Sequence, residues 1–308
     1  MTTTRTRTGK IWLGVGAAAL VSTGGAAALV STGGAAASDA ATGSSPATPG
    51  VSRPSPSGVT IKLAQAAPAH DHGTGQPAEP AGGEGGSETG GAGLPANIRF
   101  LRDIGLIRGH LLVGDELVQQ ARWADGLPHF LHPIEEIYDA IRTPLKTKHI
   151  ADFDAALKAL AQTVKAKKPE AYQQALARVD TRLAGIEAAE RATAGAAWPT
   201  TTVATVLALA QSAAGEYDGA IENGNITKPI EYQDSRGFVF YGAKLLAAVS
   251  SDLKAIDAGA LDQAVVAYSY IKTAWPGPLP PGKPVLDQTQ LLAAVSRFEL
   301  AAGPFLNR

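Results

Sequence analysis

The fold of this chain is decided by the stretch Ile104-Gly-Leu-Ile-Arg-Gly-His110-Leu-Leu-Val-Gly-Asp-Glu-Leu117. Its apolar side chains recur every three or four residues, which is the repeat of an amphipathic helix. The same repeat continues from Asn97 to the end of the chain, and no alternating run is long enough to indicate a strand. The sequence therefore predicts an all-α fold of antiparallel helices, built as one bundle or as two packed bundle halves.

Prolines, capping residues and turn residues divide this helical region into segments. The expected helices span residues 97–121, 133–141, 152–164, 169–186, 203–221, 230–256, 261–273 and 287–302. A proline-rich run over residues 275–284 predicts an extended excursion before the last helix. The turn Asn223–Thr227 is expected to divide the helical domain, residues 96–308, into halves of about 96–222 and 226–308.

The residues before this domain have a different composition. A basic start followed by a short apolar run predicts a signal peptide over residues 1–37, with cleavage as late as residue 66 or, alternatively, an uncleaved anchor. Residues 38–95 contain almost no large apolar side chains, which predicts a disordered linker. Its His70-Asp71-His72 segment could bind a metal weakly, although a solvated segment is the expected state. The chain is therefore expected to be periplasmic or secreted, with no transmembrane span in the mature protein.

Composition excludes several classes of protein. The chain has no cysteine, so disulfides and thiolate metal sites are impossible. Its formal net charge is −1, which provides no basic field for nucleic acid. The glycine-rich phosphate and dinucleotide motifs and the serine-hydrolase motif are also absent from the sequence.

Histidines and glutamates gather in one short part of the helical domain. Four of the six histidines lie between residues 110 and 149, and His129 and His132 stand beside Glu135 and Glu136. Because His132 and Glu135 are three residues apart, they would share one face of a helix. Imidazole and carboxylate ligands suit iron, zinc, manganese or copper, so the pattern predicts a site for a divalent or trivalent metal ion.

His110 lies on the apolar stripe of the first helix and is expected to face the interior. A core histidine bonded to a neighbour is one interpretation, and a metal ligand is the other. In an antiparallel pair of helices, His110 would lie about 10–16 Å along the axis from His132, since each residue adds about 1.5 Å. A shared set of ligands from these two histidines is therefore not expected, and His110 with Glu136 is as plausible a pair as His132 with Glu135.

A second polar run opens the expected helix over residues 230–256. Glu231 and Asp234 share a face, and Arg236 could pair with either acid. The run directly precedes Phe238, and polar groups so close to apolar residues are costly to bury without partners. Two interpretations stay open: acids that complement the helix dipole, and contributions of Glu231 and Asp234 from the second half to the metal site.

A family resemblance follows from these residues. A secreted, cysteine-free helical chain with an H-x-x-E motif resembles the imelysin-like proteins, which include periplasmic iron-uptake lipoproteins and relatives of an insulin-cleaving membrane protease. His132-Pro-Ile-Glu135 matches the H-x-x-E part of the family motif G-x-H-x-x-E, and Phe130 stands where the family has glycine. The resemblance covers residues 97–308 loosely and implies two helical bundle halves with metal binding. Protease activity is not carried over, because the sequence shows no nucleophile and no full zinc-protease motif.

The expected function is metal binding, iron first, for capture or delivery of the ion or its chelate in the periplasm. His132 and Glu135 would contact the ion, and His110, His129 and Glu136 would contact it or support its ligands. The alternative is a non-enzymatic protein that binds a cell-envelope partner and has a structural histidine cluster. A metal-dependent hydrolase is the third hypothesis.

Overall fold

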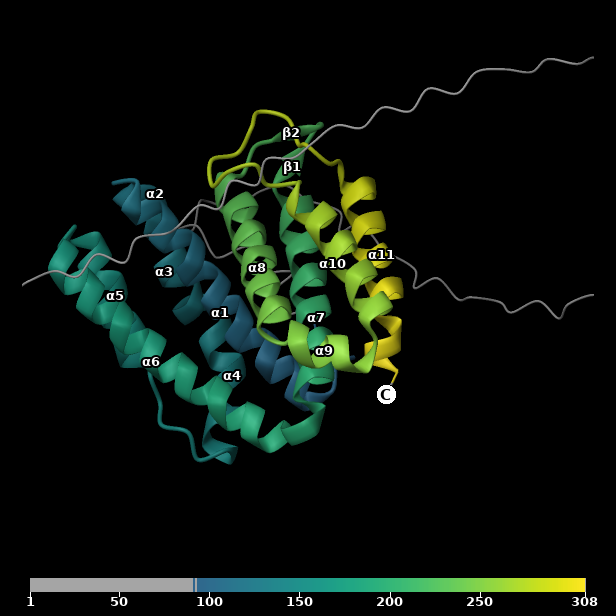
Figure 1. Cartoon of the computed structure of the whole chain (residues 1–308). Coiled ribbons are helices and arrows are strands. Elements are labelled where there is room, and N and C mark those ends of the chain that lie inside the picture. The colour runs from purple at the N-terminus through teal and green to yellow at the C-terminus, as the bar shows by residue number, and fades with distance from the viewer. Residues whose placement is uncertain (1–90, 92, 308) are drawn as a thin grey trace, which may run out of the picture. The chain divides into compact units, whose positions relative to one another are not determined.

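The computed structural model describes residue 91 and residues 93–307 (Figure 1). The expected signal peptide, its cleavage sites and nearly all of the expected linker lie outside the described residues. Those described are almost entirely α-helical, as the sequence predicts. Within this part of the chain, no helix combines the length and the apolar character that a membrane crossing requires.

Eleven α-helices account for most of the described chain. In chain order they are α1 (Ala96–Gln119), α2 (Trp123–Gly126), α3 (Pro128–His132), α4 (Tyr138–Thr147), α5 (Asp154–Lys165), α6 (Pro169–Ala194), α7 (Trp198–Gly219), α8 (Pro229–Ala248), α9 (Ser250–Ile256), α10 (Ala258–Lys272) and α11 (Gln288–Leu306).

A small hairpin stands where the sequence predicts a helix stop. Strand β1 (Ile221–Glu222) pairs antiparallel with β2 (Asn225–Ile226). Both turn residues have a positive φ, 51° at Asn223 and 74° at Gly224. Asn-Gly favours this two-residue turn because both residues tolerate the left-handed region.

The helix expected to begin at Pro133 begins earlier, at Pro128, and is irregular. Residues Pro133–Ile137 form a π-helical turn between α3 and α4. Pro133 has no N–H and its ring crowds the carbonyl group four residues earlier, so it disturbs a regular α-helix at the point where the π-helical turn begins. The turn changes which side chains share a face with His132.

Other helix limits also differ from expectation, and α6 extends to Ala194 rather than ending near residue 186. Helix α7 begins at Trp198 rather than near residue 203, with Pro199 in its first turn, where a missing N–H costs nothing. The single helix expected over 230–256 is two helices, α8 and α9, with the break at Val249. The Ser250 hydroxyl donates to the Ala247 carbonyl oxygen at this break.

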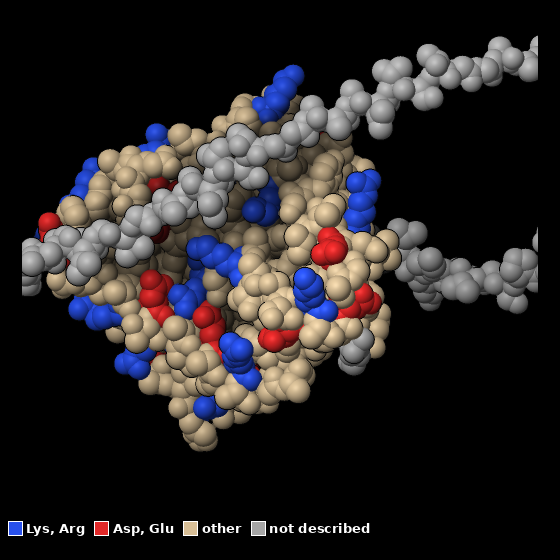
Figure 2. All heavy atoms as spheres, viewed as in Figure 1, with Lys and Arg blue, Asp and Glu red and all other residues tan. Residues whose placement is uncertain are grey.

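Helices α7, α8, α10 and α11 lie side by side, with α7 packed along α8 and α11, and α10 along α11 (Figure 1). Helix α1 packs against α7 and α8, while α5 pairs with α6. The division expected at residues 222–226 stays a prediction, and the two helices that flank it, α7 and α8, pack against one another. Figure 2 shows acidic and basic side chains interspersed on the drawn face, which is hollowed.

An open cleft of 450 Å³ is lined by residues of α1, α6 and α8. Arg108 of α1 bonds to Asp180 and to Glu187 of α6, each at 2.9 Å. The Tyr241 hydroxyl of α8 donates to Glu187 at 2.6 Å. These bonds connect α6 to α1 and α8, the helices that carry His110 and Asp234.

Candidate metal centre

Two glycines bring α1 and α8 into direct backbone contact. A Cβ atom added to Gly237 would lie 2.8 Å from the carbonyl carbon of Gly109 and would overlap its oxygen. Only glycine allows this approach. His110 follows Gly109 directly, and Asp234 lies one turn before Gly237, so the contact brings these two polar side chains together.

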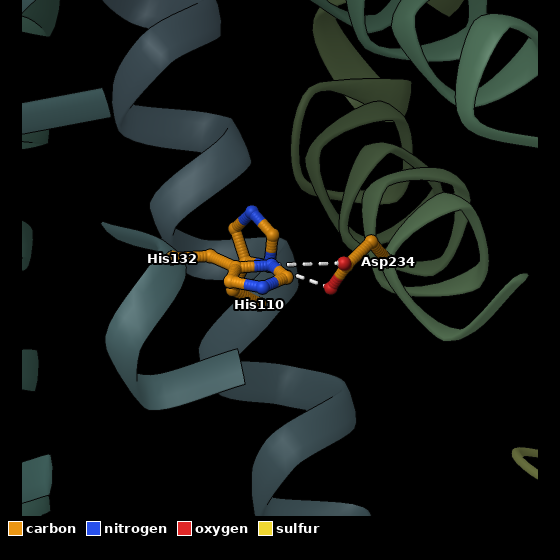
Figure 3. A group of neighbouring side chains, drawn as sticks. All are labelled: His110, His132 and Asp234. Atoms are coloured by element: carbon orange, nitrogen blue, oxygen red, sulfur yellow. Dashed lines mark hydrogen bonds and ion pairs between the residues drawn. The ribbon is translucent and has the colours of Figure 1, made fainter. Parts of the chain in front are cut away.

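The carboxylate of Asp234 is the centre of a cluster of three histidines. Its Oδ1 accepts hydrogen bonds from Nδ1 of His110 and from Nδ1 of His129, both at 2.6 Å, and its Oδ2 accepts one from Nδ1 of His132 at 3.1 Å. Figure 3 shows His110 and His132 facing Asp234 across the gap between helices. His110 and His129 are 0% exposed and Asp234 2%, whereas the His132 side chain is 19% exposed. The cluster is therefore buried and reaches solvent at His132.

The expectation that His110 and His132 lie too far apart is wrong, and their ring centroids are 5.3 Å apart. The chain turns back along α1 before α3 begins. A Cβ atom at Gly126 would lie 3.1 Å from the Gly114 carbonyl oxygen, and one at Gly114 would lie 3.2 Å from Cβ of His129. Through α2 the chain therefore runs back along α1 by more than one helical turn before α3 begins. The sequence prediction assumed a short direct link between the helices and did not include this return.

His129 occupies a position with two acceptors. Its Nδ1 faces Asp234, and its Nε2 lies 2.9 Å from Oε1 of Gln233. Nε2 of Gln233 donates to the Pro278 carbonyl oxygen at 3.1 Å, which directs Oε1 towards the histidine. Both ring nitrogens of His129 therefore face oxygen atoms, and these two contacts fix the orientation of the ring.

Burial and neighbouring charges shift the pKa in opposite directions, both at Asp234 and at His132. Burial alone would raise the pKa of Asp234, but His110 and His129 beside it lower that pKa well below its ordinary value. Burial alone would lower the pKa of His132, but its hydrogen bond and attraction to Asp234 raise that pKa above its ordinary value. Asp234 is thus a buried carboxylate stabilised by the histidines around it.

The remaining predicted site residues lie at the margin of the cluster or outside it. His132 faces Glu136, with Nδ1 3.9 Å from Oε2, and Glu135 is exposed. Glu231 is partly buried at the start of α8. Among the described residues, only one group of three ligating side chains has donor atoms within 4.8 Å of one another: His110, His132 and Asp234.

Arg236 pairs across helices rather than with its neighbouring acids, which corrects the sequence expectation. Its guanidinium makes two hydrogen bonds with the Glu116 carboxylate of α1, the longer at 3.0 Å, and lies 4.2 Å above the Phe240 ring. Phe238 places its ring against His110, with the centroids 5.0 Å apart. The charges of α8 thus stabilise the α1–α8 contact.

The proline-rich run reaches this site, which the sequence analysis did not predict. The Tyr232 hydroxyl donates to the Gly277 carbonyl oxygen at 3.0 Å, and Trp275 Nε1 donates to Ser235 Oγ at 2.9 Å. Together with the bond from Gln233, these contacts bind the run to the same turn of α8 that carries Asp234. The dense polar run was the available signal, since buried polar groups need partners.

Comparison with known proteins identifies one part of the chain. Residues 195–303 match the family model described as the iron permease-associated 4-helix bundle domain. This range contains α7 to α10, most of α11, and Asp234, while the three histidines of the cluster precede it. No curated protein and no solved structure matches the chain. The match does not test the imelysin-like resemblance, which stays a prediction; residues 195–303 are similar to an iron permease-associated four-helix bundle.

Proposed function

We propose that the chain binds a transition metal ion, iron first, in the cluster of His110, His132 and Asp234. The observation that supports this most is the convergence of two imidazoles and one carboxylate within 4.8 Å. Two histidines with a carboxylate are a donor set that iron, manganese, zinc and copper accept, and this combination is typical of iron(II) sites with open positions. The donor set therefore fits the proposed ion.

The similarity of residues 195–303 to an iron permease-associated domain supports a role in iron uptake. In this proposal the protein captures the ion or its chelate and delivers it to a permease or another cell-envelope partner, in the periplasm or outside the cell. Partial exposure of His132 gives the ion a route to the buried ligands.

The other residues have supporting roles in this proposal. His129, whose ring nitrogens both face acceptors, would position Asp234 and balance its charge rather than contact the ion. Glu136 lies beside His132 at the accessible edge, where a carboxylate would attract a cation. Glu135 and Glu231, predicted as ligands from the sequence, lie outside the group of converging donor atoms.

His132→Ala is expected to weaken metal affinity by about 10–100-fold, the range that loss of a supporting or ligating group typically costs. His149→Asn is the matched control, because His149 is exposed and has a positive φ of 56°, which asparagine tolerates. Isothermal titration of both folded variants with Zn²⁺, a redox-inert probe, measures the difference. Equal affinities would leave the cluster a purely structural one, as the alternative hypothesis of an interaction protein requires.

Metal affinity is expected to rise with pH. A metal ion must displace the proton of His132, and the pKa of this histidine is raised by its bond to Asp234 against the opposing effect of burial. Below that pKa each pH unit costs up to about tenfold in apparent affinity per displaced proton. Zn²⁺ titrations between about pH 6 and pH 8 should show the gain, continuing above the ordinary histidine value of about 6.5. An apparent Kd that does not change over this range would argue against histidine ligation.

A further inference from the structure

Helices α10 and α11 carry most of the large exposed apolar side chains of the described region: Val265, Val266, Tyr270, Leu292 and Leu300. Val266 is 71% exposed and Leu300 79%. Val266 and Tyr270 also line a groove between the two helices. An exposed apolar patch marks an interaction site more often than isolated apolar residues do.

A groove of 570 Å³ runs between these two helices. Buried and half-buried small side chains line it, among them Ala267, Ala294 and Ala301. Val266 stands at its edge and projects into solvent. The face therefore offers a protruding apolar side chain and an apolar recess next to one another.

The register of the two helices places the charges of the groove at its opposite ends. The rings of Tyr268 and Phe298 are in contact, with centroids 4.9 Å apart, and the helices run antiparallel (Figure 1). Val266 precedes Tyr268 by two residues, and Leu300 follows Phe298 by two residues. Because the helices are antiparallel, Val266 and Leu300 lie at the same height along the helix axes. Asp262 lies about 6 Å from Val266 along the axis towards one end, at about 1.5 Å per residue.

The other end of the groove is basic. The guanidinium of Arg297 lies 6.0 Å from the ring centroid of Tyr270, which is one turn beyond Val266. Asp262 and Arg297 both line the groove and are both exposed. Along the groove they are thus separated by about 12 Å, with the apolar side chain of Val266 between them.

We propose that this face binds a second copy of the chain. A two-fold axis through the middle of the groove, near Val266, places the grooves of the two copies against each other in opposite directions. Asp262 of each copy then meets Arg297 of the other. In a two-fold interface each surface must be complementary to itself, and an acid at one end with a base at the other satisfies this condition. The apolar centre and charged ends also match the usual anatomy of a protein interface.

Val266→Asp tests the centre of this interface. A charge there is expected to weaken dimerisation of the purified full chain by about 30-fold or more, as loss of a central interface residue does. Val285→Asp is the matched control, because Val285 is 50% exposed, follows the proline-rich run and does not line the groove. Sedimentation equilibrium measures both, with circular dichroism to confirm folding. A wild-type chain that stays monomeric at about 100 µM, or equal effects of the two variants, would overturn the proposal.

A charge exchange tests the two-fold geometry itself. Asp262→Arg and Arg297→Asp each place like charges opposite one another, and each is expected to weaken the dimer by about tenfold. Mixing the two variants creates a heterodimer in which both contacts are again between opposite charges. Recovery to within about threefold of the wild-type affinity on mixing is the expected result. A mixture no more associated than the separate variants would contradict the pairing.

Discussion

Asp234→Ala is expected to lower the free energy of unfolding by about 3–5 kcal/mol, the cost of removing one partner of a buried charge cluster. Three histidines donate to this carboxylate, and two of them are fully buried. Without it, the buried rings of His110 and His129 would each lose a hydrogen-bond partner. Urea denaturation followed by circular dichroism measures the change.

Asp139→Ala is the control for that measurement. The Asp139 side chain is 90% exposed and pairs with Arg142 at the surface, where such pairs contribute about 0–1 kcal/mol. If Asp234→Ala proves as mild as Asp139→Ala, the carboxylate is not the centre of the cluster.

Gly237→Ala is expected to destabilise the fold by about 1–3 kcal/mol, the usual range for forcing extra atoms into a packed contact. The new methyl group would meet the Gly109 backbone, which cannot give way as a flexible side chain could. Separating α1 from α8 would also move His110 away from Asp234, so metal affinity should fall in parallel. Thermal unfolding and Zn²⁺ titration of the same sample give both results.

Gly185→Ala in α6 separates this steric effect from helix propensity. No atom lies within 4 Å of a Cβ built at Gly185, so alanine there should stabilise the protein by about 0.5–1 kcal/mol. Stabilisation by both substitutions would show that the α1–α8 contact tolerates a methyl group, and the glycine argument would then be wrong.

The helices were predictable because their signals are local. The three-and-four apolar spacing, Pro169 at the start of α6 and the Asn223-Gly224 turn each act within a few residues. The helix limits that were predicted wrongly lie where a local group is compatible with more than one kind of turn. Pro133 suits the first turn of a helix as well as a π-helical turn inside one, and the spacing of apolar residues does not distinguish the two.

The site was less predictable because it depends on contacts between distant segments. The residue types were identified, and His110, His132 and Asp234 were all expected near a metal. Their convergence depends on the return of the chain through α2 and on the backbone contact of Gly109 with Gly237. Neither feature has a signature in spacing along one helix. Spacing also could not decide which acid lies beside His132, because residues three and four apart both share a helix face, and the structure places Glu136 there.

The most direct test of the central claim is anomalous X-ray diffraction at the iron edge from crystals of the full chain grown with Fe²⁺ under reducing conditions. The account predicts one strong peak bounded by the side chains of His110, His132 and Asp234, which Asp234→Asn should remove. A peak confined to His70 and His72, or no peak at the cluster in crystals that contain iron, would contradict it.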